Sequence, residues 1–440
     1  MSVEPDLSRG EIPPVGPAHA ARGDTGSYAP VLRRKKGDWI AMGAISALAA
    51  VAVGGAVLTA NINDAERTVV NAPGDDAQVV VPSQAPAALT EAFRLPTAGY
   101  PGLNRPLVAR GLVITNDEHT VTATNEDGST AWTYARSDVP ICSIGSAWDK
   151  VVVTFETGVG CGDVVAISAA TGEYAGTRSA LSSDYVVPIR SNDRVGTVSN
   201  ERVELWRSDL VRTVEYGDVE AKQESGFQPH EDCTINSALT RSELLVVSES
   251  CPDQPETSYL RFMKTTPEDS RKPEVLKDVA ISTSGARVVA VGTEGAAVYV
   301  PSSPPLIISF NQQGQETSRT EVPASPTVTQ ASSPFAPATG DLPAHMTWWD
   351  GKRLYLFNPE TLAVERSFDR ALGVGTAISD RLVFPTRDGI AVANWSTGEI
   401  ERTIPVDRGG YSGPVAVSRA GNNLVELRGN EVVALKMRTG

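Results

Sequence analysis

Residues 163–176 read DVVAISAATGEYAG, a pattern that recurs along the chain and decides the fold. The segment starts as a run of β-favouring residues, turns at Thr171-Gly172 and returns as a second strand. Glycine suits the tightest point of such a turn because it adopts a positive φ at little cost. Three other segments share the plan: HTVTATNEDGSTAWTY (119–134), RLYLFNPETLAVER (353–366) and IAVANWSTGEIERT (390–403). We therefore expect an all-β body built from repeated hairpins.

A short apolar run accompanies each repeat and gives the period. Such runs start at Leu112, Val151, Arg194, Leu244, Arg287, His345, Arg381 and Asn423, at spacings of 36 to 58 residues. A period of about 40–50 residues with several strands per unit is typical of a β-propeller. Residues 92–440 allow eight blades of about 44 residues or seven of about 50. The eight runs favour eight blades.

The two ends of this body predict how the ring closes. The chain stops at EVVALKMRTG, inside the hairpin turn, so the last repeat lacks its outer strand. An unassigned strand, LTEAFRLPT (89–97), precedes the first complete repeat. Pairing this strand with the last repeat would close the ring and remove a free sheet edge.

An apolar run near the N-terminus indicates a membrane anchor. Residues 40–60, from Ile40 to Ala60, contain no charge and no proline, and as a helix they span about 30 Å. The alternative is a cleaved signal peptide, but 38 residues precede residue 39 and the run exceeds the usual length of about 7–15 residues. The basic residues 33–36 predict a cytoplasmic N-terminus. We expect a single-pass plasma-membrane protein with an extracytoplasmic propeller.

This division predicts four regions along the chain. They are a disordered cytoplasmic tail (1–38), a transmembrane helix (39–60), a polar linker (61–91) and the propeller (92–440). Residues 61–440 carry 33 basic and 48 acidic side chains, which argues against a nucleic-acid partner. Residues 323–341, PASPTVTQASSPFAPATGD, read as a long mobile loop that is either a binding lid or an inert insertion.

The four cysteines predict two disulfides. Cys142 and Cys161 are 19 positions apart, Cys233 and Cys251 are 18 apart, and each pair brackets a β-run in the same way. Four cysteines allow three pairings, and the repeat symmetry selects Cys142–Cys161 and Cys233–Cys251. A metal site is the alternative, but cysteines so far apart without a nearby histidine lack ligand spacing.

The hairpin plan resembles the PQQ-like repeat of quinoprotein-alcohol-dehydrogenase-like propellers, over residues 92–440. Enzymes of that family are expected to show adjacent cysteines, a calcium site and a catalytic Asp. No two cysteines are adjacent here, and no residue matches the calcium or catalytic positions. We therefore expect no cofactor, no metal and no enzymatic activity. Trp206, Trp348 and Trp349 are expected in the core rather than as stacking platforms.

The overall plan also resembles single-pass actinobacterial membrane proteins with a quinoprotein-like propeller, on the segments 205–217 and 401–415. That resemblance implies an architecture and a compartment. The principal hypothesis is a protein-binding or scaffolding module for an envelope or membrane protein. The alternatives are a PQQ-dependent dehydrogenase and a small-ligand-binding sensor.

Two loops supply candidate partner contacts. AGYPGLNRP (98–106) and RTIPVDRGGYSGPVAV (402–417) are expected at one mouth of the central channel. Arg and Tyr side chains often anchor protein interfaces. The candidate contacts are Tyr100, Arg105, Asp407, Arg408 and Tyr411; the alternative is that these loops are shaped only for their turns.

Overall fold

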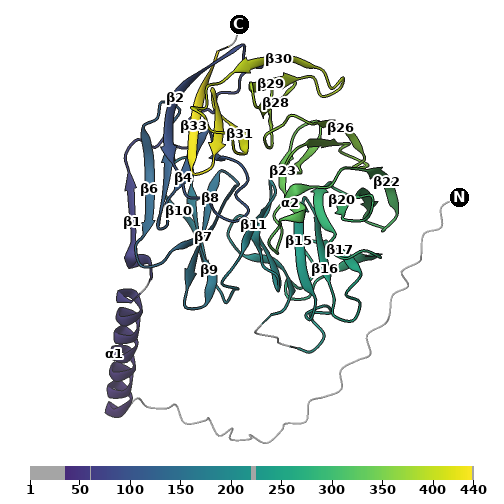
Figure 1. The fold of residues 1–440 in the computed structure, drawn as a ribbon. Helices are drawn as coiled ribbons and strands as arrows, with labels where there is room; N and C mark the ends of the chain where they lie inside the picture. Colours follow the sequence, from purple (N-terminus) through teal and green to yellow (C-terminus); the bar gives the residue numbers. More distant parts are fainter. Residues whose placement is uncertain (1–34, 60, 220–223, 439–440) are drawn as a thin grey trace, which may run out of the picture. The chain divides into compact units, whose positions relative to one another are not determined.

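The computed structural model describes residues 35–59, 61–219 and 224–438 (Figure 1). The chain forms two compact units, Met1–Asn63 and Asp64–Gly440. In the first unit, helix α1 (Lys36–Leu58) has no buried residue and is long and apolar enough to cross a membrane. It begins before the predicted residue 39 because the Asp38 carboxylate accepts a 2.7 Å hydrogen bond from the Lys35 N–H at its N-terminus. Most of the predicted tail lies outside the described residues.

The described part of the second unit forms eight antiparallel sheets, which confirms the eight-bladed propeller. Each blade has four strands, and blade 1 has a fifth on its outer edge. From the innermost strand outward, blade 1 contains β3 (Leu107–Ala109), β4 (Leu112–Asn116), β5 (Thr120–Thr124), β6 (Thr130–Arg136) and β1 (Ala65–Val69). Blade 2 contains β7 (Ile141–Ala147), β8 (Lys150–Thr157), β9 (Gly160–Ser168) and β10 (Tyr174–Ser179). Blade 3 contains β11 (Val187–Arg190), β12 (Val195–Val198), β13 (Arg202–Trp206) and β14 (Arg212–Gly217).

The remaining blades follow the same order. Blade 4 contains β15 (Thr234–Arg241), β16 (Leu244–Ser250), β17 (Ser258–Lys264) and β18 (Val275–Ile281). Blade 5 contains β19 (Arg287–Val291), β20 (Gly295–Val300), β21 (Leu306–Asn311) and β22 (Glu316–Glu321). Blade 6 contains β23 (Ala338–Asp341), β24 (Met346–Trp349), β25 (Leu354–Phe357) and β26 (Val364–Phe368). Blade 7 contains β27 (Thr376–Ile378), β28 (Arg381–Thr386), β29 (Gly389–Ala393) and β30 (Ile400–Pro405). Blade 8 contains β31 (Val415–Ala420), β32 (Asn423–Arg428), β33 (Glu431–Arg438) and β2 (Ala88–Pro96).

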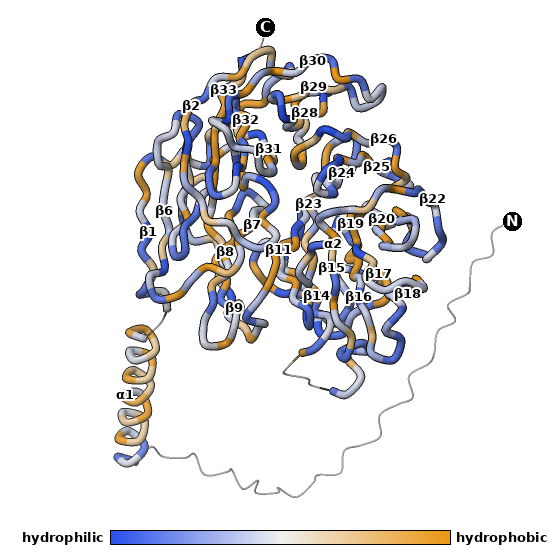
Figure 2. Tube along the Cα trace, viewed as in Figure 1, coloured by the Kyte–Doolittle hydropathy of each residue, from blue (hydrophilic) through white to orange (hydrophobic). Residues whose placement is uncertain are grey.

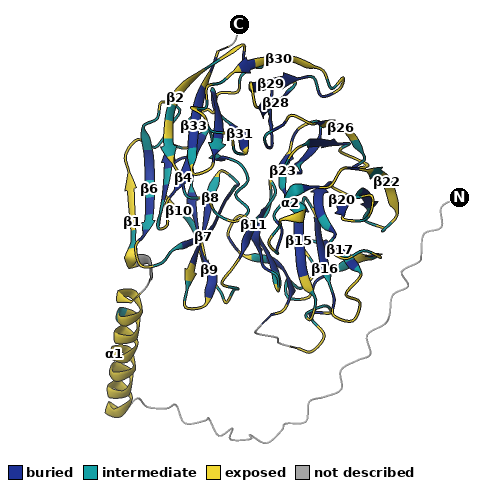
Figure 3. Cartoon of the chain, in the orientation of Figure 1, coloured by how far each residue is buried: buried dark blue, intermediate teal, exposed yellow. Residues whose placement is uncertain are grey.

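Seven of the eight apolar runs coincide with the second strand of a blade, and the run at Arg287 is the first strand, β19. Second strands are covered on both faces by neighbouring blades, so β4 and β16 are almost continuously buried. Outer strands face solvent, and β22 and β30 are mostly exposed, as Figure 3 shows. The 58-residue spacing before His345 therefore combines this change of strand with the long segment 322–337.

The ring closes through β2, as predicted from residues 89–97. β2 pairs antiparallel with β33, from Ala88 opposite Arg438 to Pro96 opposite Glu431. Figure 1 shows β2 lying beside β33 at the outer edge of blade 8. An N-terminal strand therefore completes the C-terminal blade, and the two ends of the propeller sequence are joined by backbone hydrogen bonds.

The segment expected to be a linker, 61–91, is largely built into the propeller instead. After η1 (Asn61–Asp64), β1 pairs with β6 from Ala65 opposite Arg136 to Val69 opposite Trp132. Residues 70–87, which we name the strap, then cross to β2. Arg110 donates to the carbonyls of Asp75 and Ala77, Arg419 to Val80 and Arg402 to Pro86. Guanidinium groups from blades 1, 8 and 7 thus satisfy the strap's backbone.

The segment expected to be a mobile loop, 323–341, also has defined structure. It contains α2 (Pro326–Thr329), whose N-cap Ser325 accepts a 3.2 Å hydrogen bond from the Val328 N–H, and it ends in β23. Phe335 forms a parallel bridge with Ser237 of β15 and is buried. The polar composition suggested a free loop, but distant strands supply partners for its backbone.

The core lies between neighbouring blades. Its largest side chains, Trp132, Trp206 and Trp348, are almost fully buried, which confirms the core placement of two of the three tryptophans considered. Trp349 is half-buried. Hydrophobic residues follow the inner and middle strands in Figure 2, and polar residues concentrate on the turns. Inter-blade packing is therefore the main stabilising contact of the ring.

Candidate functional site

The strand order gives the propeller two different faces. Antiparallel strands alternate in direction, so loops from an outermost strand to the next blade lie on the same side as loops between second and third strands. We call this side the connecting face and the opposite side the turn face. Both candidate loops, 98–106 between β2 and β3 and 406–414 between β30 and β31, belong to the connecting face.

The loop 98–106 separates its two candidate residues. The Tyr100 hydroxyl donates to the Asp117 carbonyl at 2.9 Å, and burial raises the pKa of Tyr100 to about 12. Arg105 points the other way, into the central cavity, where its Nε donates to Ser418 Oγ at 3.2 Å. Arg105, expected as a partner contact at the mouth of the channel, lines the channel itself and stays a candidate contact.

Arg408 in the second loop holds the fold together rather than facing a partner. Its guanidinium donates to both carboxylate oxygens of Glu426, at 2.7 and 3.1 Å, and to the carbonyls of Thr386 and Gly389. The Arg408 side chain is 6% exposed and that of Glu426 is fully buried. A buried carboxylate needs such a partner. As a partner contact Arg408 stays a prediction, and in the structure its guanidinium is occupied by Glu426.

Asp407 and Tyr411 remain at the surface of the same loop. The Asp407 carboxylate accepts a 2.9 Å hydrogen bond from the Gly409 N–H, and the Tyr411 hydroxyl donates to the Pro414 carbonyl at 2.9 Å. Gly409 and Gly410 both have positive φ, which lets the loop turn sharply between these side chains. Both side chains stay candidate contacts.

A groove of about 590 Å³ lies next to this loop, where connecting loops of blades 6, 7 and 8 meet. Its walls combine Trp349 and Leu372 with the cations Lys352, Arg370 and Arg387. Among the described residues, none of these three cations forms an ion pair, while the lining acids are Asp369 and Asp388. The sequence did not single out these cations because each lies in an ordinary polar turn; only the ring brings the turns together.

Both predicted disulfides are confirmed. Cys142 is bonded to Cys161 and Cys233 to Cys251, each within one blade near the connecting face. The first joins β7 to β9 across β8, and the second joins the start of β15 to the end of β16. Each bond restrains a connecting loop against the blade that follows it.

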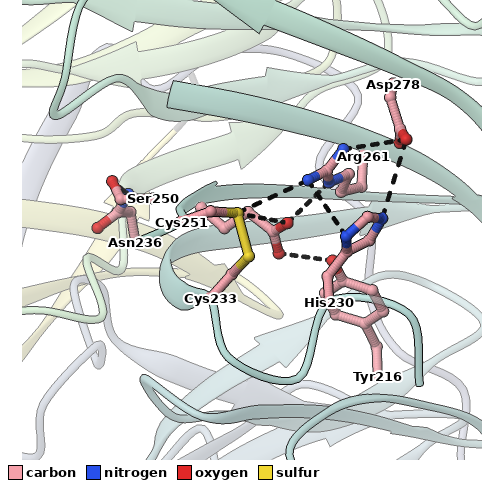
Figure 4. Close-up of a disulfide and its surroundings, with 9 residues drawn as sticks. Tyr216, His230, Cys233, Asn236, Ser250, Cys251, Arg261 and Asp278 are labelled. Atoms are coloured by element: carbon pink, nitrogen blue, oxygen red, sulfur yellow. Dashed lines mark hydrogen bonds and ion pairs between the residues drawn. A yellow bond between two sulfur atoms is a disulfide. The ribbon is translucent and has the colours of Figure 1, made fainter. Parts of the chain in front are cut away.

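The Cys233–Cys251 bond borders a buried charge network, shown in Figure 4. The Arg261 guanidinium donates from Nε to Glu249 Oε1 at 2.7 Å and pairs with Asp278 at 3.0 Å. Glu249 also accepts a 2.5 Å hydrogen bond from the Tyr216 hydroxyl, and burial with the Glu249 charge raises the pKa of Tyr216. Every charge here has a partner within the protein.

The same place holds the one cluster of metal-ligand type within the described ranges, His230, Cys233 and Glu249. The expectation that no histidine lies near the cysteines is therefore wrong for Cys233, which His230 precedes by three positions. The Cys233 sulfur is committed to its disulfide, and Glu249 is committed to Arg261 and Tyr216. The residues therefore do not offer a free ligand set.

Comparison with known proteins gives a partial family match. Residues 23–232 match the family described as outer membrane protein assembly factor BamB. No curated protein matches the chain. Among solved structures, BamB from Moraxella catarrhalis is 13% identical, with a TM-score of 0.46, and the alignment covers 80% of this chain and all of that one. A chain of the mitotic checkpoint complex is 11% identical, with a TM-score of 0.44, over 85% of this chain and 96% of that one. The chain is thus an eight-bladed β-propeller that is similar, over residues 23–232, to the outer membrane protein assembly factor BamB family.

Proposed function

We propose that this protein is a membrane-anchored scaffold that binds an envelope or membrane protein through the groove on its connecting face. The observation that carries the proposal is the combination of Trp349 and Leu372 with three cations that form no ion pair with any described residue. Aromatic and basic side chains around a hollow are typical of protein-binding surfaces. The partner segment would be acidic and extended, with an apolar side chain for the Trp349 wall.

The anchor and the compartment belong to the same proposal. Helix α1 would cross the plasma membrane once, with the basic residues before it in the cytoplasm and the disulfide-bonded propeller outside. The partial match to a family described as an outer membrane protein assembly factor supports a role in the cell envelope. Asp407 and Tyr411, at the rim of the loop beside the groove, would contribute further contacts.

Site-specific photocrosslinking in native membranes tests the groove. A photoreactive residue at Arg387 should give a discrete adduct, and the same residue at Arg207, an exposed side chain in the β13–β14 turn, should give none. The double variant Arg370→Glu/Lys352→Glu should abolish the Arg387 adduct, because it reverses the charge that attracts an acidic segment. An adduct that survives this charge reversal, or that also forms from Arg207, would refute the groove as the docking site.

A further inference from the structure

A second cavity, of about 470 Å³, lies at the centre of the ring. Its lining includes residues from the innermost strand of every blade, β3, β7, β11, β15, β19, β23, β27 and β31. It is therefore the central channel of the propeller. Its volume falls within the range of about 300–1,000 Å³ that is common for small-molecule sites.

The charges in this cavity have the opposite sign to the protein as a whole. The chain carries a net charge of −14, but the cavity is lined by Arg105, Arg190, Arg241 and Arg419 against a single acid, Asp341. Asp341 is already bound by Arg241 through two hydrogen bonds of 2.9 and 3.1 Å. Three guanidinium groups are thus left without a carboxylate partner among the described residues.

Arg105 and Arg190 contribute most to this excess of positive charge in the cavity, because their partners are neutral. Arg105 donates to Ser418 Oγ at 3.2 Å and Arg190 to Ser146 Oγ at 3.1 Å, and within the described ranges neither forms an ion pair. Both serine hydroxyls donate onward to backbone carbonyls, so they serve the arginines as neutral acceptors. Each guanidinium has five N–H donors, and among the described residues each forms one side-chain hydrogen bond, to its serine.

The environment makes these charges unfavourable when the cavity contains only water. Burial, together with the nearby Arg190 charge, lowers the pKa of Arg105 to about 10, and burial also lowers the pKa of Arg190. Both groups are still protonated at neutral pH, so two like charges share one cavity. An anion between them would relieve the repulsion and supply the missing acceptors.

The connecting side of the cavity is closed by two loops that meet over it. Asn104 donates to the Ala336 carbonyl at 2.9 Å, and Phe335 is bridged to Ser237 of β15. Gly102 has φ +80°, and a Cβ there would lie 2.8 Å from Pro188 and 3.0 Å from Ala336. The closure between these two loops is therefore close-packed.

We propose that the central cavity binds a small anionic molecule, with Arg105 and Arg190 holding a carboxylate or phosphate group between them. Guanidinium groups match the planar geometry of these oxyanions and bind them through two parallel hydrogen bonds. Arg419, at the same end as Arg190 and Arg241, would contact a second acidic group. The cavity shares no lining residue with the protein-binding groove, so the two sites can be tested separately.

Isothermal titration of the full-length protein in detergent tests this site, with inorganic phosphate and citrate as probes at constant ionic strength. Saturable binding of at least one probe is expected, and Arg105→Met and Arg190→Met should each weaken it roughly 10-fold or more, since each removes a charge-assisted contact. Arg207→Met removes an exposed arginine remote from the cavity and should leave the affinity unchanged. Citrate binding without phosphate binding would assign a carboxylate ligand, and the reverse a phosphate ligand.

Two results would overturn the proposal: no saturable binding of either probe, or binding that persists unchanged in Arg105→Met and Arg190→Met. Circular dichroism and crosslinking from Arg387 check that the variants are folded and that the groove is intact. Loss of anion binding with a retained crosslink would separate this site from the scaffold function.

Discussion

Arg261 of blade 4 is buried, and Arg105 and Arg190 of the central cavity are half-buried, but their side chains have different kinds of partner. Arg261 contacts Glu249 and Asp278, and its side chain is 5% exposed. Within the part of the chain that the structure describes, the side-chain hydrogen bonds of Arg105 and Arg190 go to serine hydroxyls alone. A buried charge with a full set of partners serves the fold, whereas a charge left with unused donors is available to a ligand.

The largest expected effect is the loss of stability when Arg261, the arginine with two carboxylate partners, is replaced. Arg261→Met leaves Glu249 buried without its cation, and we expect the free energy of unfolding to fall by about 3–5 kcal/mol. Urea unfolding followed by tryptophan fluorescence measures this change. Arg207→Met is the matched control because Arg207 pairs with Asp209 at the surface. Equal effects of the two substitutions would mean that the network contributes nothing specific.

The second-largest expected effect is the loss of stability when one of the two disulfides is removed. The double variant Cys233→Ser/Cys251→Ser should lose about 3 kcal/mol, as expected for a loop of this length. The Cys142–Cys161 loop spans 19 residues and the Cys233–Cys251 loop 18, so chain entropy alone predicts equal losses. A clearly larger loss for Cys233–Cys251, measured by urea unfolding, would show that this bond also positions the Arg261 network.

The third prediction is that replacing a cavity arginine does not lower the free energy of unfolding, in contrast to replacing Arg261. Arg105→Met removes a half-buried charge that forms no ion pair with the described residues, so in anion-free buffer stability should stay the same or rise by about 1 kcal/mol. The measurement is again urea unfolding, with and without citrate. Citrate should stabilise the wild type but not the variant. If Arg105→Met lowered the free energy of unfolding as much as Arg261→Met, Arg105 would be a structural residue like Arg261 and not one available to a ligand.

The smallest expected effect is a pH-dependent contribution to stability from the Arg136–Asp138 pair, in which Asp138 is the titrating group. Arg136 binds Asp138 through two 2.8 Å hydrogen bonds, which lower the pKa of Asp138 below its ordinary value of 3.8. This pair therefore contributes stability above pH 3.8 that is lost as the pH falls through the lowered pKa. Asp138→Asn should cost about 1 kcal/mol at pH 7. Unfolding measured from pH 7 to pH 2 should show the two proteins converging; a constant difference would contradict the assignment.

Much of the architecture was predictable because it depends on local pattern. Buried second strands such as β16 produce apolar runs at a regular period, and turn glycines such as Gly172, with φ +68°, mark the hairpins. The disulfide pairing followed from the repeat as well. The exposed strand β1 was missed because AERTV has no apolar face, so pairing with β6 is its only structural signal.

The candidate site was predicted less well because the direction of a loop side chain depends on partners that are distant in the sequence. Arg408 and Arg105 stand in similar Gly- and Pro-rich loops, and nothing in either loop distinguishes a surface arginine from an inward one. The carboxylate that fixes Arg408 is Glu426, 18 positions later, and the hydroxyl that meets Arg105 is Ser418, 313 positions later. Side-chain direction was set by these distant partners.

Local patterns and repeats were enough to favour eight blades over seven and to predict the closing strand, both disulfides and the apolar helix, because each depends on residues close together or on a repeat. Tertiary structure alone decided which side chains share a surface. The groove cations lie on three loops of blades 6 and 7, which become neighbours when these two adjacent blades pack together. The cavity arginines come from four positions on or beside innermost strands, between residues 105 and 419, and they surround one cavity only when β2 closes the ring.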